Sequence, residues 1–124
     1  MTAPLRLFPL YTTLGDLGGF LLYPYIFNPQ GEWIGWVTPE KQVYSVWGEY
    51  VGWLNQDFRI LRRRSYDHDQ PKRNPPPKPG RVTLPAHTPL PPMMAELKYD
   101  IMDVLEERPE LMPTPDAYAF DDEG

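Results

Sequence analysis

The sequence lacks cysteine altogether and holds only two histidines, which excludes several kinds of site at the outset. Without cysteine a chain has no disulfide, no thiolate zinc site and no cysteine nucleophile. A protein without disulfides suits a reducing compartment, and we expect it in the cytoplasm. Long apolar runs are also missing: the longest, LGGFLLYPYIF, has 11 residues, whereas a membrane-spanning helix needs about 20. We therefore expect a soluble chain with no removed leader sequence and no membrane partner.

Motifs that carry catalysis or bind cofactors are equally scarce. The sequence has no glycine-rich phosphate loop, no nucleophilic serine elbow and no pair of histidines at a metal-ligand spacing. One polar loop, Asp67-His68-Asp69, places an imidazole between two carboxylates, a combination that can bind a metal or transfer protons. A solvated loop tip is the simpler interpretation. We expect no enzyme activity, no cofactor and no metal, and we keep this loop as a third-ranked alternative.

What the chain has instead is an internal repeat. The stretches GDLGGFL, GEWIGWV and GEYVGWL align without gaps, and each contains a first glycine, an acidic residue, a second glycine and an aromatic residue. Repetition of this kind predicts a fold built from repeated units. The aligned positions are Gly15, Gly31 and Gly48; Asp16, Glu32 and Glu49; Gly19, Gly35 and Gly52; and Phe20, Trp36 and Trp53.

Each repeat is typical of a β-hairpin. Runs rich in aromatic and β-branched residues flank the glycine–acidic pair, and such runs favour strands. A glycine at the first central position supplies the positive φ that a type II′ turn requires. The predicted hairpins pair residues 10–14 with 17–22, 25–28 with 33–37, and 43–47 with 50–54.

The second glycine of each repeat lies inside a strand, where glycine is normally a weakness. We expect a neighbouring backbone or ring to pack where its Cβ would stand. In the third repeat, alternation places Tyr50 and Leu54 on one face of the strand, and Val51 and Trp53 on the other. Both faces are apolar, and a lone hairpin cannot bury both. The hairpins must therefore pack around a shared centre.

A fourth repeat begins in phase with the other three, at FRILRRR. Its return strand is missing where the repeat would place it, and a proline-rich stretch stands there instead. We predict a fourth hairpin that pairs residues 58–63 with 81–84. The alternative is that the strand at 58–63 ends the sheet and that 81–84 belongs to a linker.

Tandem short hairpins with a glycine–acidic–aromatic–x–glycine–tryptophan pattern resemble the small bacterial four-fold β-flower family. The resemblance covers about the first 60 residues. It implies four hairpin-like repeats about a pseudo-symmetry axis, and it implies no activity and no catalytic residues. The fourth repeat of this chain departs from the pattern of the family.

The rest of the chain changes character twice. Residues 71–92 hold 9 of the 17 prolines, which favours an extended or polyproline II arm. Further on, Pro92 can open a helix and Pro109 must close it, so we predict an amphipathic helix over 93–108. Its apolar stripe consists of Met94, Leu97, Ile101, Val104 and Leu105.

The predicted fold class is therefore mostly β. It comprises pseudo-symmetric tandem β-hairpin repeats, a proline-rich extended arm and one C-terminal amphipathic helix. The expected organisation is a repeat domain over 1–66, with 81–84 as its candidate last strand, a basic arm over 67–92, the helix over 93–108 and an acidic tail over 109–124.

The charge of the chain is unevenly spread. Residues 58–81 carry eight basic and two acidic side chains, whereas residues 82–124 carry two basic and ten acidic ones. Within the basic run 59–64, the side chains of Arg62, Arg63 and Arg64, beside aromatic residues on the hairpins, are the kind of surface that binds single-stranded nucleic acid. The overall charge of −5 argues against this interpretation, and we keep it as the alternative function.

The leading prediction is a non-enzymatic protein-interaction or scaffold module, as in an accessory subunit of a larger assembly. An isolated helix of about 16 residues is marginal in water, so its apolar stripe must bury against something. We predict that Met94, Leu97, Ile101 and Leu105, together with the arm, bind another protein or a second copy of this chain.

Overall fold

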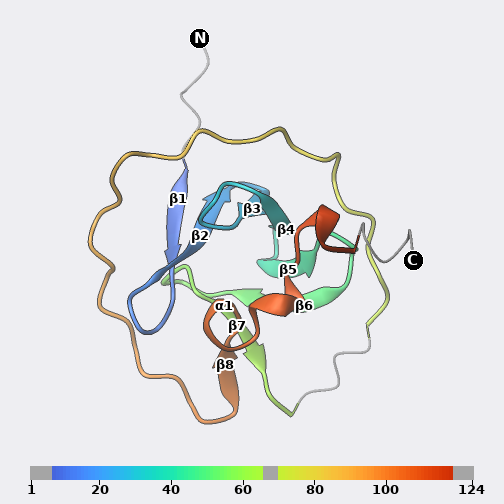
Figure 1. Cartoon of the computed structure of the whole chain (residues 1–124). Helices are drawn as coiled ribbons and strands as arrows, with labels where there is room; N and C mark the ends of the chain where they lie inside the picture. Colours follow the sequence, from blue (N-terminus) through green and yellow to red (C-terminus); the bar gives the residue numbers. More distant parts are fainter. Residues whose placement is uncertain (1–6, 66–69, 119–124) are drawn as a thin grey trace.

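The computed structural model describes residues 7–65 and 70–118. These residues form one antiparallel sheet of eight strands that follow each other in chain order. Figure 1 shows the sheet curling around a centre into which the C-terminal segment folds. A mostly β fold of hairpins with one short C-terminal helix is therefore confirmed. The elements are β1 Phe8–Tyr11, β2 Leu17–Leu22, β3 Tyr25–Phe27, β4 Trp33–Val37, β5 Gln42–Ser45, β6 Tyr50–Leu54, β7 Ile60–Arg63, β8 Ile101–Asp103, α1 Val104–Glu107, and the 3-10 helices η1 Pro109–Leu111 and η2 Pro115–Tyr118.

Five of the turns between strands share one conformation. Each is a three-residue loop whose last residue has a positive φ, the geometry of a type I turn followed by a bulge. In the first turn the Gly15 N–H donates to the Thr12 carbonyl oxygen (2.9 Å), and the Thr12 N–H donates to that of Asp16 (2.8 Å). The predicted type II′ geometry is therefore wrong, although the need for a positive φ at these glycines is real. The positive-φ residues are Gly15, Gly31, Lys41, Gly48 and Phe58.

A β-bulge at the same place in each repeat explains why the sheet curls. The pairings of β1 with β2, β3 with β4, and β5 with β6 each slip by one residue, at Gly18, Ile34 and Val51. A bulge bends its strand and increases the local twist, so three of them in equivalent positions roll the sheet.

The second glycine of each repeat follows its bulge directly. A Cβ placed on Gly19, Gly35 or Gly52 would lie 2.3, 2.6 or 1.9 Å from a carbonyl oxygen of the adjacent strand. Contacts this short cannot be accommodated without moving the strand. The close approach expected from the sequence is therefore observed. Its cause is the neighbouring main chain, and at Gly35 the Met112 side chain contributes as well, at 2.5 Å.

Both faces of the sheet are buried, as the strand pattern predicted. The inner face is aliphatic, and residues of the C-terminal segment, Val104 and Met112, complete its core. The outer face is aromatic: its core contains Phe20, Phe27, Trp33, Trp36 and Tyr44. Of the repeat tryptophans, Trp36 belongs to this outer core, whereas Trp53 is half-buried in β6.

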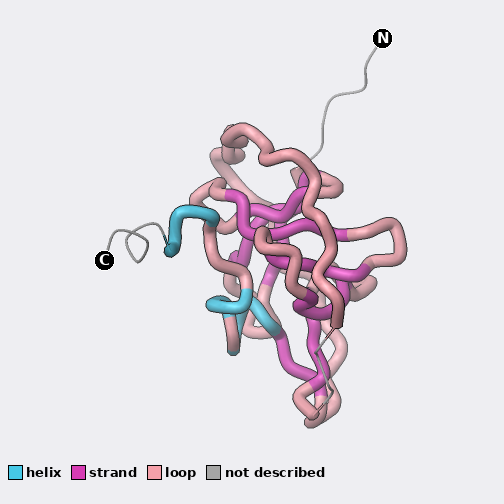
Figure 2. The backbone as a smooth tube through the Cα atoms, turned by 90° about the vertical axis from the view of Figure 1, so that its right-hand side faces the viewer, coloured by secondary structure: helices cyan, strands magenta, loops and turns pink. Residues whose placement is uncertain are grey.

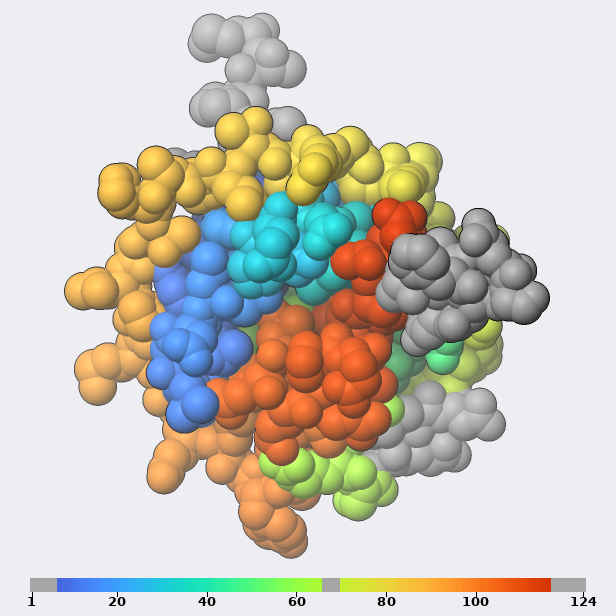
Figure 3. All heavy atoms as spheres, in the orientation of Figure 1, coloured from blue at the N-terminus to red at the C-terminus, as the bar shows by residue number. Residues whose placement is uncertain are grey.

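The outer face is covered by the proline-rich part of the chain. Residues 70–98 contain no helix or strand, and Figures 1 and 3 show them running around the outside of the sheet. We call residues 70–98 the belt. The side chains of Val82 and Leu84 pack on the aromatic outer core. The Tyr25 hydroxyl donates to the Pro77 carbonyl oxygen at 2.6 Å, and the Tyr11 hydroxyl donates to that of Pro89.

The belt contacts the first glycine of each repeat. The Arg73 N–H donates to the Gly48 carbonyl oxygen at 3.0 Å. Further along the belt, Leu84 lies against Gly31, and Pro91 lies against Gly15. The repeat thus supplies three equivalent turns past which the belt runs in reverse chain order.

The last strand of the sheet comes from beyond the belt. β8 pairs with β7, with Leu61 opposite Asp103 and Arg63 opposite Ile101. The predicted pairing of 58–63 with 81–84 is wrong in its second half, because Val82 and Leu84 are occupied with the outer aromatic core.

The predicted C-terminal helix is present but covers only Val104–Glu107. Residues 93–98 have no regular structure, and residues 101–103 form β8. The reason is the open edge of β7: its unpaired main-chain groups accept a strand, whereas a lone helix of this length is marginal. Pairing with β7 also buries Met102 and lets Val104 enter the inner core.

Partly buried polar contacts join β8 to the first hairpin. The Asp103 carboxylate accepts hydrogen bonds from the Thr13 N–H (2.7 Å) and the Thr13 hydroxyl (2.8 Å). The same hydroxyl accepts one from the buried Arg59 guanidinium (3.0 Å). Arg59 also forms an ion pair with Asp57 (2.6 Å) and donates to the Ala95 carbonyl oxygen (2.9 Å). These contacts hold the two ends of the curled sheet together.

Candidate functional site

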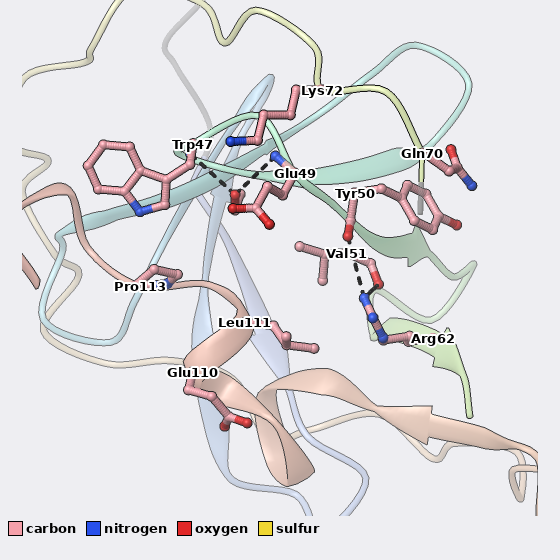
Figure 4. A pocket seen from close by; sticks show the side chains of 11 residues that line it. Trp47, Glu49, Tyr50, Val51, Arg62, Gln70, Lys72, Glu110, Leu111 and Pro113 are labelled. Atoms are coloured by element: carbon pink, nitrogen blue, oxygen red, sulfur yellow. Dashed lines mark hydrogen bonds between the residues drawn. The ribbon is translucent and has the colours of Figure 1, made fainter. Parts of the chain in front are cut away.

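A cleft beside the third repeat brings together three segments that are far apart in the chain. Its walls are the β5–β6 hairpin, the end of β7 with the start of the belt, and the η1 segment, and its volume is about 440 Å³. Figure 4 shows the side chains arranged around it, with Trp47 on one side and Tyr50 and Arg62 on the other. We call it the hairpin cleft. Its lining residues are Ser45, Trp47, Glu49, Tyr50, Val51, Arg62, Gln70, Lys72, Glu110, Leu111 and Pro113.

Trp47 stands in the loop that joins β5 to β6. The loop is held in place by Ser45, whose hydroxyl oxygen accepts hydrogen bonds from the N–H groups of Trp47 and Glu49, both at 3.2 Å. Trp47 is 42% exposed. A large aromatic side chain on a rigid turn, half in solvent, is well placed for binding a ligand.

Arg62 forms the opposite wall of the hairpin cleft. Its side chain is half-buried, and its Nη1 donates to the main-chain oxygens of Val51 (2.9 Å) and Tyr50 (3.4 Å). Burial lowers the pKa of the Arg62 guanidinium, and the positive charge of Arg108 lowers it further. The interaction with Tyr50 acts in the opposite direction but is the smallest of the three effects.

The belt contributes the second cation of the cleft, Lys72. The next residue, Arg73, anchors this part of the belt, because its N–H bonds Gly48 and its guanidinium lies 5.5 Å from the centre of the Tyr44 ring. Two carboxylates also line the cleft. Glu49 is exposed, and Glu110 forms an ion pair with Arg108.

A larger hollow of about 580 Å³ lies where the β1–β2 turn meets α1 and η1. It is lined mainly by small and aliphatic groups, among them Gly18, Ile34, Leu105 and Met112. Among the described residues, its lining includes no aromatic side chain and no cation. The hairpin cleft combines aromatic, cationic and hydrogen-bonding groups, the mixture typical of a binding site.

The three arginines predicted to bind nucleic acid lie at the end of β7 and just beyond it, and the contacts of Arg62 and Arg64 differ. Arg62 points into the hairpin cleft. Arg64 donates to the Tyr99 carbonyl oxygen at 2.9 Å and forms an ion pair with Glu107 at 2.7 Å. Arg63, between them in β7, is exposed. The hydrogen bond from Arg64 holds the pKa of Glu107 below its ordinary value.

The apolar residues predicted to bind a partner lie on no common helix face. Met94 and Leu97 belong to the belt, Ile101 to β8 and Leu105 to α1, and all four are half-buried. Leu105 lies close to Gly18 of β2. The Asp67-His68-Asp69 loop lies outside the described residues.

Metal ligands and membrane spans can be considered only for the part of the chain that the structure describes. Residues 7–65 and 70–118 contain no cluster of three or more His, Asp or Glu side chains placed to hold a metal ion. None of the helices in these ranges has the length and apolar character needed to cross a membrane.

Sequence reasoning found Arg62 and counted Lys72 among the basic residues near it, but it missed Trp47 and Glu110 and did not place Lys72 in a cleft. A usable signal existed for the tryptophan: the equivalent loop positions in the first two repeats are Leu14 and Gln30. A tryptophan at this turn tip departs from both equivalents in being aromatic. The other two residues come from segments whose approach to the third repeat depends on the path of the belt and of η1.

Comparison with protein-family models, with curated proteins and with solved structures finds no match to this chain. The assignment of a function therefore depends on the cleft itself.

Proposed function

We propose that this protein is a non-enzymatic protein-interaction module that binds a segment of a partner protein in the hairpin cleft. The observation that carries the proposal is the pairing of exposed Trp47 with half-buried Arg62 across one cleft, with Tyr50 beside them. Tryptophan, tyrosine and arginine are the residues most enriched among those that dominate protein–protein binding energies.

The cleft is also built on rigid elements, which supports a binding role. Trp47 stands on a turn fixed by Ser45, and Tyr50, Val51 and Arg62 lie on paired strands. A site whose side chains are already positioned loses less conformational entropy on binding. Figure 2 shows the strands of the single sheet in the middle of the molecule and the short helices at one side of it.

The hairpin repeat is compatible with the resemblance to the small bacterial β-flower proteins, and we include membership of that family in the proposal. A cytoplasmic location belongs to it as well, on the strength of a sequence without cysteine. Binding of a partner or second copy through Met94, Leu97, Ile101 and Leu105 stays a prediction, now without a helix face to support it.

Nucleic-acid binding by Arg62, Arg63 and Arg64 remains the alternative. The contacts of two of these residues do not favour it, because Arg62 bonds main-chain oxygens and Arg64 is paired with Glu107. Phosphate binding through Arg64 would require that ion pair to open. A metal site or small enzyme at the Asp67-His68-Asp69 loop stays the third prediction.

The proposal is tested by comparing what the full-length wild type and the Trp47→Ala variant capture from a lysate treated with nuclease. The control variant is Tyr23→Ala, which removes another exposed aromatic side chain, at 59% exposure, outside the cleft. We expect the same proteins with wild type and Tyr23→Ala, and their loss with Trp47→Ala, measured by quantitative mass spectrometry. Equal capture by all three proteins would contradict the proposal. Capture by the wild type from an untreated lysate that is lost after nuclease treatment would favour the nucleic-acid alternative.

A further inference from the structure

Positively charged side chains without an ion-pair partner in the hairpin cleft indicate the chemistry of the ligand. Both hydrogen bonds of the Arg62 side chain use Nη1. An arginine has five N–H donors, and those on Nε and Nη2 form the edge that accepts a carboxylate in two parallel bonds. Among residues 7–65 and 70–118, that edge has no hydrogen-bond acceptor and Arg62 has no ion-pair partner.

Lys72, the second cation of the cleft, also lacks an ion-pair partner among the described residues. Its side chain is exposed. The anchored residue beside it, Arg73, fixes the belt against the Gly48 turn and so keeps Lys72 at the cleft. A lysine ammonium is a mobile point charge that can follow an anion bound by a neighbouring arginine.

The carboxylates in the lining do not neutralise these cations. Glu110 is paired with Arg108, whose own positive charge is felt at Arg62. Glu49 is exposed and forms no ion pair in the described part of the chain. The wall containing Arg62 therefore favours an anion, because a half-buried cation gains most from an opposite charge.

Beside these charges the cleft also offers apolar surface. Trp47 and Tyr50 supply aromatic surface, and Val51, Leu111 and Pro113 supply aliphatic surface. A volume of about 440 Å³ accommodates one or two side chains, within the usual range for ligand sites.

We propose that the hairpin cleft binds an acidic segment of the partner, in which an Asp or Glu carboxylate engages Arg62 and Lys72 and an adjacent apolar side chain packs on Trp47 and Tyr50. This inference rests on the proposed function and specifies the chemistry of its ligand. A carboxylate satisfies the free edge of the guanidinium, and a large apolar neighbour buries the exposed indole.

The test uses the full-length protein and a panel of short acetylated, fluorescein-labelled peptides in which an aromatic or leucine residue precedes Asp or Glu. A matched panel carries Asn or Gln instead. We expect members of the acidic panel to bind at least about tenfold more tightly than their amide counterparts, as for a charge-assisted hydrogen bond, in fluorescence anisotropy titrations. The preference should shrink as salt is added.

Charge reversal at one lysine supplies the internal control. Lys72→Glu should weaken binding of the acidic panel about tenfold or more, and Lys78→Glu should change it less than twofold, because Lys78 lies on the belt outside the cleft. Both lysines are exposed, so neither change should impair folding.

The outcomes separate this inference from the proposed function. Equal binding of the two panels, or the absence of binding by the acidic panel, overturns the carboxylate inference. Suppose that the two panels bind equally. If Trp47→Ala then abolishes the binding, the cleft remains the interaction site. If the binding survives Trp47→Ala, the proposed function is overturned as well. A Lys72-dependent affinity for oligothymidylate without affinity for the acidic panel also overturns the inference, in favour of nucleic acid.

Discussion

At Gly52 the carbonyl oxygen of Leu61 occupies the place where a side chain would begin, 1.9 Å from an ideal Cβ. Gly19 and Gly35 meet equivalent oxygens of the strands that follow them. These three positions require glycine because a side chain would collide with the neighbouring strand. Gly15, Gly31 and Gly48 instead have a positive φ, which glycine adopts more readily than other residues. Two columns of the same residue thus satisfy two different physical requirements.

Gly52→Ala should destabilise the protein by roughly 1–3 kcal/mol or more, because the added methyl group forces β6 and β7 apart. The matched control is Gly80→Ala on the belt, where an added Cβ has no neighbour within 4 Å. The control should leave the free energy of unfolding within about 0.5 kcal/mol of the wild type. Urea unfolding monitored by tryptophan fluorescence measures both. Equal stability of the two variants would remove the steric account of the second glycine column.

Asp57 gives a prediction that depends on pH. Burial by itself raises the pKa of this carboxyl, but hydrogen bonds from Arg59 and Asn55 and the charge of Arg59 outweigh it, so that the pKa lies below its ordinary value. A depressed folded-state pKa means that the stabilisation is complete above the unfolded-state pKa of about 3.9, and is lost as pH falls through the folded-state value.

Asp57→Asn should therefore lower the free energy of unfolding at neutral pH, by roughly 3 kcal/mol, because buried Arg59 loses its carboxylate. The deficit relative to the wild type should shrink once the pH falls below about 3.9. Denaturant titrations at neutral and acidic pH check both statements. A deficit that is constant across this range would show that the ion pair contributes nothing.

Individual elements show which parts of the fold the sequence can predict. The first three hairpins follow from local signals: strand-forming runs around a glycine that must turn. The partner of β7 does not, because Ile101–Asp103 is separated from Ile60–Arg63 by the whole belt, and its apolar spacing suits a helix face equally well. This segment forms a strand instead of a helix because it pairs with the open edge of β7. Pairing between segments so far apart in the chain cannot be predicted from the local sequence.

The candidate site was predictable to the same limited extent. The basic run drew attention to Arg62, but its role depends on the carbonyl oxygens of Tyr50 and Val51 and on the approach of η1. Trp47 could have been found as the odd member of its repeat column. Lys72 and Glu110 enter the cleft only through tertiary structure.

Truncation after Leu84 tests the role assigned to β8. The truncated chain loses β8, Val104 and Met112, which exposes the edge of β7 and opens the inner core. We expect it to lose cooperative thermal unfolding, followed by circular dichroism, and to associate through the free edge in light scattering. A truncated chain that melts cooperatively at the temperature of the full-length protein would place β8 outside the folding unit.

At the scale of the whole molecule, the belt has two structural roles. The belt covers the aromatic outer face and carries the chain back to complete the sheet, so that the inner core is filled from the C-terminal side. In Figure 3 the C-terminal segment fills the middle of the face and the belt forms its rim. The hairpin cleft lies where three of these parts meet, and its geometry therefore depends on the fully assembled fold.

Because the cleft needs all three parts in place, ligand binding should stabilise the molecule as a whole. An acidic peptide at a hundredfold excess over its dissociation constant should raise the free energy of unfolding by about 2.7 kcal/mol. The rise should appear as a higher melting temperature in wild type and in Lys78→Glu. The same peptide concentration should give a smaller rise, or none, in Lys72→Glu.

Fluorine NMR of the full-length protein labelled with 5-fluorotryptophan can show whether Trp47 lies at the contact with the partner. The chain has four tryptophans, and the resonance of Trp47 is identified by its absence in Trp47→Phe. On addition of a captured partner protein, we expect the Trp47 resonance to shift or broaden first, while those of buried Trp33 and Trp36 stay in place. An unchanged Trp47 resonance in a saturated complex would show that the partner binds elsewhere on the protein.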